Sequence, residues 1–278
     1  AEVDPALRAT AQRSRTYDGL AWRTEAEWLA DTTIAAVAVE TTLADSTPTA
    51  LRALRAGKHV HLDKPGGLDH ETFAAMRREA EQRRRQVQMG YMLRHNPGLR
   101  LVREAVTAGW LGKITGYDAG MGKRADAGLR RALLAHPGHG MMELGCHLVD
   151  LTVTLLGVPN AVRAQAERTG SDDLPDRQGA ALRYVWGEAT LSCDHADATA
   201  RRWLTITGTG GKAQFSGGKF EGDLDAYVRR VLRDVGGSQS TLSSSTVRRT
   251  NVNGLPVAYA VARATTNSGW VDVTVYAY

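Results

Sequence analysis

The chain has 278 residues, enough for two modest domains or one large one, and its apolar content of 42% is ordinary for a globular protein. No run of about 18 apolar residues occurs and no signal peptide is visible at Ala1, so we expect a cytoplasmic protein without a membrane span. The net charge of +5 comes mostly from arginine, and the Arg83–Arg85 run falls on a charged helix. This pattern favours a solvated helix face over a nucleic-acid site.

The two cysteines, Cys146 and Cys193, show neither metal-type nor redox-type spacing. Cys146 lies inside an apolar helical stretch, where it behaves most simply as a small core residue. We therefore predict no disulfide framework and no metal site.

The first residues, Ala1-Glu2-Val3-Asp4-Pro5, place acidic residues between a short apolar start and a predicted helix at 6–13. At the end of the second strand of a dinucleotide-binding unit, an acid accepts hydrogen bonds from the ribose hydroxyls of NAD. An Asp before Pro and a helix is also a common helix cap. No strand and no G-x-G-x-x-G turn come before Ala1, so we expect a truncated unit.

The next part of the chain alternates between strand and helix patterns. The continuous apolar run at 34–39 is typical of a strand buried on both faces of a sheet. Alternation of this kind predicts a parallel α/β sheet. After a short helix at 25–29 and this first strand, the expected elements are a helix at 47–56 with Pro48 in its first turn and Gly57 as its cap, a strand at 59–62, a helix at 71–85 and a strand at 87–91.

The pattern changes after Asn96-Pro97, where strands begin to follow one another without long helices between them. This change predicts a mostly antiparallel sheet with one face covered by helices. The fold class is therefore α/β plus α+β, with an incomplete Rossmann domain at 1–96 and a substrate domain at 97–278. The expected elements are a helix at 98–108, a strand at 114–121, a polar irregular loop at 122–138, a helix at 141–156, strands at 162–167, 179–186, 188–194, 203–207 and 212–215, and a C-terminal hairpin from 257–262 and 271–275.

The segment Gly140–Asp150 opens an apolar helix that carries three ionisable groups. Glu143, His147 and Asp150 stand at i, i+4 and i+7, a spacing that places them on one helix face. Such groups are costly among apolar residues unless they face one another or a cleft. A carboxylate four residues before a histidine can fix the imidazole tautomer and raise its basicity. Spacing alone also fits a satisfied polar stripe at a domain interface.

Several separate motifs resemble those of the Gfo/Idh/MocA oxidoreductase family. Residues 53–65, ALRAGKHVHLDKP, resemble its AL-x-AGKHV-x-x-EKP signature, and Gly138–Asp150 resembles its GG-x-x-x-D-x-G-x-H-x-x-D helix. Residues 90–97 with 109–114 look like its linker between domains, and 206–211 are similar to its late strand and turn. The motifs stand in the right order over roughly residues 1–220, which makes the resemblance specific.

The resemblance implies a Rossmann domain followed by a substrate domain with an open sheet, and hydride transfer between NAD(P) and a hydroxyl-bearing carbon of a sugar or polyol. It implies Lys64, Glu143 and His147 as the catalytic set. NAD is preferred over NADP because Glu2 would repel a 2′-phosphate. By analogy, two copies would pair through the open sheet. The implied cofactor-binding residues are Glu2, Thr41, Thr42, Lys64, Tyr91 and Arg94, and Asp150, His136 and His139 are expected near the substrate.

The sequence departs from the family pattern at several positions. Asp63 replaces the usual Glu before Lys-Pro, Glu143 replaces the usual Asp, and His139 stands where a second Gly is usual. The first strand and the Gly-rich turn that seats the pyrophosphate are missing, and the Ser- and Thr-rich end is unusual. Two other functions therefore stay open: an NAD-dependent glycosidase of the same family, and a binding or assembly protein without the reaction.

Overall fold

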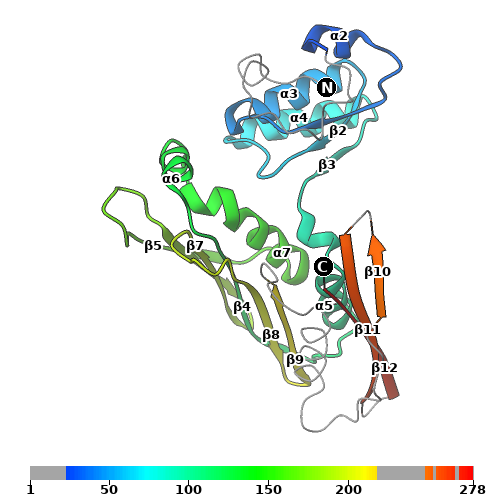
Figure 1. The fold of residues 1–278 in the computed structure, drawn as a ribbon, viewed down its shortest axis with the longest axis vertical. Helices are drawn as coiled ribbons and strands as arrows, with labels where there is room; N and C mark the ends of the chain where they lie inside the picture. Colours follow the sequence, from blue (N-terminus) through cyan, green and yellow to red (C-terminus); the bar gives the residue numbers. More distant parts are fainter. Residues whose placement is uncertain (1–22, 218–247, 253–254, 267–268, 278) are drawn as a thin grey trace. The chain divides into compact units, whose positions relative to one another are not determined.

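The computed structural model describes residues 23–217, 248–252, 255–266 and 269–277. The chain divides into two compact units, residues 1–90 and 91–278 (Figure 1). The sequence placed the domain boundary a few residues later, at 96/97. Glu2, the expected helix at 6–13 and the Ser-rich part of the C-terminal segment lie outside the described residues.

The first unit contains a three-stranded parallel sheet with the order β1-β2-β3. Helices connect the strands, so the predicted alternation of strand and helix is confirmed. The elements are α2 (Glu25–Ala30), β1 (Ala36–Val39), α3 (Leu43–Arg55), β2 (His59–Leu62), α4 (His70–Gln82) and β3 (Val87–Met89).

The core of the first unit lies on one face of this sheet. Leu54 of α3, Leu62 of β2 and Met76 of α4 are fully buried together. Ala36 and Ala38, which alternate with the buried side of β1, are exposed. The prediction that this strand is buried on both faces is therefore wrong for the described part of the chain, because α3 and α4 pack against a single face.

Helix α3 begins earlier than the sequence indicated. Thr42 is its N-cap residue and Leu43 its first residue, so Pro48 lies inside the helix and not in its first turn. Asp45 stands in the first turn, where a carboxylate interacts favourably with the partial positive charge of a helix N-terminus. The apolar pattern alone had suggested a start at residue 47.

The second unit is built on a six-stranded sheet with the order β5-β6-β7-β4-β8-β9. All neighbouring strands are antiparallel except β4 and β7, which run parallel. The mostly antiparallel sheet predicted from the sequence is confirmed. Its strands are β4 (Ile114–Gly122), β5 (Ala161–Glu167), β6 (Arg177–Tyr184), β7 (Gly187–Asp194), β8 (Arg202–Gly208) and β9 (Gly211–Gly217).

Helical segments precede and cover this sheet, and a small separate sheet follows it. The predicted C-terminal hairpin is observed as β11 paired with β12, and β10 adds a strand that the sequence did not indicate. The remaining elements are η2 (Met92–His95), α5 (Pro97–Thr107), α6 (Ala127–Leu134), the π-helical turn η3 (Met141–Gly145), α7 (Cys146–Leu156), β10 (Arg248–Val252), β11 (Leu255–Thr266) and β12 (Gly269–Ala277).

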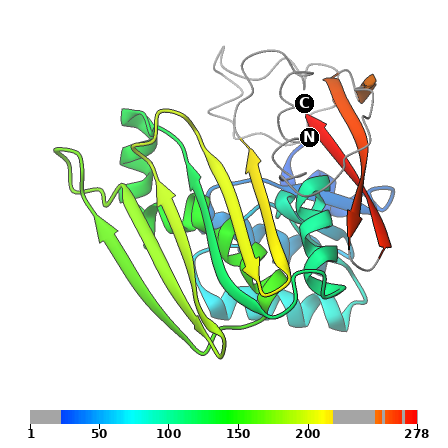
Figure 2. The same ribbon diagram turned by 90° about the horizontal axis from the view of Figure 1, so that it is seen from below.

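Helix α7 packs on one face of the six-stranded sheet (Figures 1 and 2). Leu148 and Leu151 of α7 are buried with Tyr117 of β4 and Leu191 of β7 in one apolar core. The opposite face of the same strands carries exposed polar groups such as Thr190. The sheet is therefore one-sided, as expected from the sequence, and pairing of two copies through its open face stays a prediction.

The segment expected to be an irregular loop, 122–138, contains helix α6. Asp126 caps this helix by accepting a hydrogen bond from the Leu129 backbone amide at 2.8 Å. A side-chain oxygen at the N-cap satisfies one of the amides that a helix start leaves without a partner. The Arg-, Ala- and Gly-rich composition hid this helix because it spans only two turns.

Replacing Leu191 with alanine tests the core of the second unit. Leu191 has no exposed surface, and buried Leu→Ala changes cost about 2–5 kcal/mol because they lose apolar burial and leave a cavity. We expect a loss of that size in the free energy of unfolding, measured by urea denaturation. The matched control is Val185→Ala, whose side chain is 97% exposed and whose loss should stay within about 0.5 kcal/mol. Equal losses in the two variants would contradict the assigned core.

Candidate active site

The carboxyl ends of the parallel strands of the first unit carry three of the predicted site residues. Thr41 and Thr42 follow β1 and are exposed, and Lys64 follows β2. Because β1 and β2 are adjacent and parallel, these ends lie at the same edge of the sheet. Nucleotides bind at this edge in open α/β sheets. The predicted cofactor residues Thr41, Thr42 and Lys64 are therefore gathered where a nucleotide would bind.

The backbone around Lys64 is shaped by neighbouring contacts. The Asp63 amide donates to the Val39 carbonyl at 2.9 Å, which continues the pairing with β1 one residue beyond the end of β2. The Lys64–Pro65 peptide bond is cis. Gly67 has a φ of +90°, and a Cβ there would lie 1.9 Å from the Thr47 hydroxyl oxygen. The turn after Lys64 therefore requires glycine and packs directly against α3.

In the second unit, the predicted helix at 141–156 is observed, but its first turn is π-helical. A π-turn bonds each amide to the fifth residue before it, so it widens the helix locally, and such turns are frequent at functional sites. The i, i+4 spacing of Glu143 and His147 therefore does not by itself stack the two side chains as it would in a regular α-helix. The proposed pairing of these two residues stays a prediction.

The Glu143 carboxylate joins two side chains that the sequence had not singled out. Lys123 donates from Nζ to Oε1 at 2.9 Å, and His195 lies with Nε2 at 3.1 Å from Oε2. Lys123 follows β4 and His195 follows β7. These two strands are parallel neighbours, so their carboxyl ends meet beside the π-turn. We name this group, Lys123, Glu143 and His195, the carboxylate bridge.

The imidazole of His147 lies almost entirely within the protein, with 6% of the residue exposed and its Nδ1 atom buried. The Tyr91 ring makes a T-shaped contact with it, with the ring centroids 6.1 Å apart and the ring planes at 83°. Burial, with smaller contributions from Cys146 and Asp150, raises the pKa of Tyr91 to about 12. The phenol is therefore neutral at physiological pH and can act as a hydrogen-bond donor beside His147.

Asp150 forms a two-pronged ion pair with Arg94. The Arg94 Nε atom lies 2.8 Å and 3.1 Å from the two carboxylate oxygens, and the Asp150 side chain is 7% exposed. The hydrogen bonds to Asp150 raise the pKa of the Arg94 guanidinium. The structure thus brings four predicted residues together in one unit: Tyr91, Arg94, His147 and Asp150.

The two loop histidines lie before the π-turn and are half-buried. His139 has a φ of +46°, a left-handed conformation that explains why the family motif usually has glycine there. Its Nδ1 atom lies 2.9 Å from the Leu133 carbonyl, so the ring closes the end of α6. His136 donates its backbone amide to the same carbonyl. A substrate role for His136 and His139 stays a prediction.

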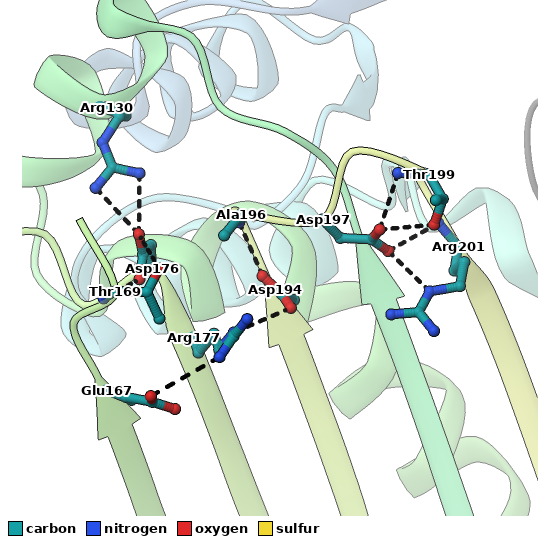
Figure 3. A network of polar contacts seen from close by, with 10 residues as sticks. All are labelled: Arg130, Glu167, Thr169, Asp176, Arg177, Asp194, Ala196, Asp197, Thr199 and Arg201. Carbon is teal, nitrogen blue, oxygen red and sulfur yellow. Dashed lines mark hydrogen bonds and ion pairs between the residues drawn. The ribbon is translucent and has the colours of Figure 1, made fainter.

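A network of ion pairs holds the loops at the edge of the sheet next to this site (Figure 3). Arg130 of α6 donates to Asp176 at 3.1 Å and also binds Asp172. Burial alone would raise the pKa of Asp176, but hydrogen bonds from Thr169 and Arg130 lower it. The network therefore ties α6 to the start of β6.

Asp197 anchors the loop between β7 and β8 in the same way (Figure 3). Its carboxylate accepts hydrogen bonds from the backbone and hydroxyl of Thr199 and from Arg201. Burial opposes ionisation, but these bonds outweigh it and lower the pKa of Asp197 to about 2. Asp197 is therefore ionised over the whole physiological range.

The second unit also matches a known family. Residues 99–214 match the family described as the GFO/IDH/MocA C-terminal domain. This segment is a Gfo/Idh/MocA C-terminal domain. The family indicated by the sequence motifs is thereby confirmed. No curated protein sequence matches the chain significantly.

Solved structures resemble the chain at low sequence identity. GenD2 from gentamicin A biosynthesis, in complex with NAD, is 19% identical with a TM-score of 0.67, over 92% of this chain and 67% of its own. The scyllo-inositol dehydrogenase of Lactobacillus casei is 18% identical with a TM-score of 0.62, over 90% and 65%. The WlbA dehydrogenase of Chromobacterium violaceum, in complex with NADH and UDP-GlcNAcA, is 17% identical with a TM-score of 0.62, over 75% and 66%. The chain thus shares their fold and spans about two thirds of their length.

Two other findings concern the described residues of the chain. None of their helices combines the length and the apolar character needed to cross a membrane. Among the same residues, no group of three or more His, Cys, Asp or Glu side chains is arranged to hold a metal ion.

Asp197→Asn tests the ion pairs at the edge of the sheet. The folded-state pKa of about 2 lies below the ordinary value of 3.8, so ionised Asp197 stabilises the fold above about pH 4 and this contribution is lost as the pH falls toward 2. We expect the variant to lose about 1–2 kcal/mol of unfolding free energy at pH 7, with the difference shrinking between pH 4 and 2. Urea denaturation at each pH measures it.

The control is Asp173→Asn, whose side chain is 90% exposed in its ion pair with Arg168. Exposed pairs contribute little, so this variant should match the parent protein at every pH. A deficit in Asp197→Asn that is independent of pH would contradict the electrostatic explanation.

Proposed function

We propose that the protein is an NAD-dependent oxidoreductase that transfers a hydride between the cofactor and a hydroxyl-bearing carbon of a sugar, polyol or related carbohydrate. The observation that carries the proposal is the nearly buried imidazole of His147, which lies in T-shaped contact with Tyr91 on the main helix of a Gfo/Idh/MocA domain. The names of the solved structures that share the fold support it, since they include an inositol dehydrogenase, a dehydrogenase in complex with NADH, and GenD2 in complex with NAD.

The residues of the first unit fit a nicotinamide dinucleotide. The exposed hydroxyls of Thr41 and Thr42 and the amine of Lys64 follow adjacent parallel strands, at the edge where such cofactors bind. These groups can donate hydrogen bonds to ribose and phosphate oxygens. NAD, when bound, accepts the two electrons and the hydrogen of the substrate C–H bond.

His147 is the proposed base for the alcohol. Oxidation of a hydroxyl-bearing carbon releases the hydroxyl proton, and a neutral imidazole can take it. Because Nδ1 is buried, Nε2 is the nitrogen assigned to this proton. Because the Tyr91 phenol beside the ring is neutral, no phenolate charge acts on the basicity of the His147 imidazole. The reverse reaction returns the proton from Nε2 to the carbonyl oxygen of the product.

Lys64 and Glu143 complete the proposed catalytic set. The ammonium of Lys64 would donate a hydrogen bond to the substrate oxygen and stabilise the negative charge that develops on it. The negative charge of the Glu143 carboxylate would stabilise the imidazolium that forms when His147 takes the proton. Lys64 belongs to the first unit and Glu143 to the second.

His147→Ala should abolish hydride transfer and leave NAD binding unchanged. Loss of a general base costs typically about 10²–10⁴-fold in rate, while the cofactor groups Thr41, Thr42 and Lys64 belong to the first unit and are not changed. NADH formation is followed by absorbance with a panel of inositols and sugars, and NAD affinity by calorimetry. The same protocol detects the glycosidase alternative as aglycone release without net NADH.

The matched control is His59→Ala. His59 lies at the start of β2, the end of the strand opposite Lys64, and accepts a hydrogen bond from the Gln86 amide. Its loss should leave turnover near the parent value. Undiminished turnover in His147→Ala would refute its role as the base, and absence of NAD binding by the parent protein would favour a binding or assembly function.

A further inference from the structure

We propose that His195 is a positioning residue, which fixes the Glu143 carboxylate at the π-turn together with Lys123. This inference rests on the proposed oxidoreductase function. It concerns a histidine that no motif marks and that the proposed reaction does not use directly. Only 1% of His195 is exposed, so it acts through the group that it contacts.

The two carboxylate oxygens of Glu143 have different partners on different strands. Oε1 accepts from the Lys123 ammonium at 2.9 Å, and Oε2 lies 3.1 Å from Nε2 of His195. An ammonium at this distance favours the ionised form of a carboxylate, which can only accept hydrogen bonds. The proton of the His195 ring must therefore be on Nε2. Fixing both oxygens leaves the carboxylate with one orientation.

The backbone of His195 is held in place by its own hydrogen bonds, independently of the contact between its ring and Glu143. The His195 amide donates to the Asp176 carbonyl at 2.7 Å, and the His195 carbonyl accepts from the Ala125 amide at 2.9 Å. These bonds link the chain after β7 to the start of β6 and to the chain after β4. Figure 3 shows the neighbours of His195, Asp194 and Ala196, at this edge of the sheet. The backbone that carries the ring is thus hydrogen-bonded to the ends of two other strands.

The π-turn is shaped to receive the ring. A Cβ on Gly140 would lie 2.5 Å from Nδ1 and Cε1 of His195, so only glycine allows this approach. Gln178 of β6 accepts a hydrogen bond from the Met141 amide at 3.1 Å and fixes the start of the same turn. The residue that anchors the turn and those that hold its carboxylate therefore come from the ends of three neighbouring strands, β6, β7 and β4.

A double-mutant cycle separates positioning from a general structural role. We expect His195→Ala to lower kcat/KM by about tenfold to a hundredfold, since a misplacement of about 1 Å can cost about 10²-fold. In a Glu143→Ala background the same change should cost less than about twofold, because its target is already absent. His195→Gln, whose amide can still donate to Glu143, should recover most of the activity.

Leu191→Ala is the control for the cycle. This change perturbs the core but removes no polar contact with Glu143. Any loss in kcat/KM should therefore be the same factor in the parent protein and in Glu143→Ala. If His195→Ala also loses the same factor in both backgrounds, the residue is merely structural and the inference is overturned. Failure of His195→Gln to recover activity in a protein of parental melting temperature would also contradict it.

A second measurement does not depend on turnover. Nitrogen-edited NMR spectra of the imidazole groups, with His195 assigned from the signal missing in His195→Gln, should show its proton on Nε2 and a shift of that signal in Glu143→Gln. A proton on Nδ1, or a signal insensitive to Glu143, overturns the placement. If the parent protein transfers no hydride to NAD, the proposed function fails, and the spectra still decide whether His195 holds Glu143.

Discussion

The pairing of β4 with β7 is the constraint on which the candidate site depends. These strands are far apart in sequence but run parallel side by side, so Lys123 and His195 emerge at one edge of the sheet. There they share the carboxylate of Glu143. The carboxylate bridge connects these strand ends to the π-turn, and α7 continues from that turn with His147 in its first residues and Asp150 beyond. One strand pairing thus determines where the polar groups of the helix are placed.

In the rest of the second unit, apolar contacts hold α7 against the sheet, and ion pairs set the positions of polar side chains. Leu148 and Leu151 fasten α7 to the sheet through an apolar core, which has no directional preference of its own. Ion pairs supply the direction: Asp150 binds Arg94, and Asp176 binds Arg130. Breaking such a pair leaves a nearly buried carboxylate without its charged partner, which is strongly destabilising. The elements around the candidate site are therefore held together by ion pairs between residues of different elements.

Much of the fold could be predicted because its signals are local. The apolar run at 34–39, the expected strand at 59–62 and the helix cap Gly57 indicated the parallel sheet, and the strand expected at 188–194 is observed as β7. The carboxylate bridge could not be predicted, because no local pattern shows that β4 and β7 are neighbours. The π-turn was missed for a related reason: the spacing of Glu143 and His147 fits an α-helix, and it is contacts from Gln178 and His195 that accompany the wider turn. Helix α6 was missed because two turns give little periodicity.

The central proposal is that Lys64 and His147 act on one substrate oxygen beside a nicotinamide ring. A crystal structure of the protein with bound NADH tests it most directly. The account predicts that the Lys64 amine and the His147 imidazole converge next to nicotinamide C4, both within about 2.6–3.2 Å of a single position where an alcohol oxygen can lie. A nicotinamide ring that lies away from either side chain would contradict the account.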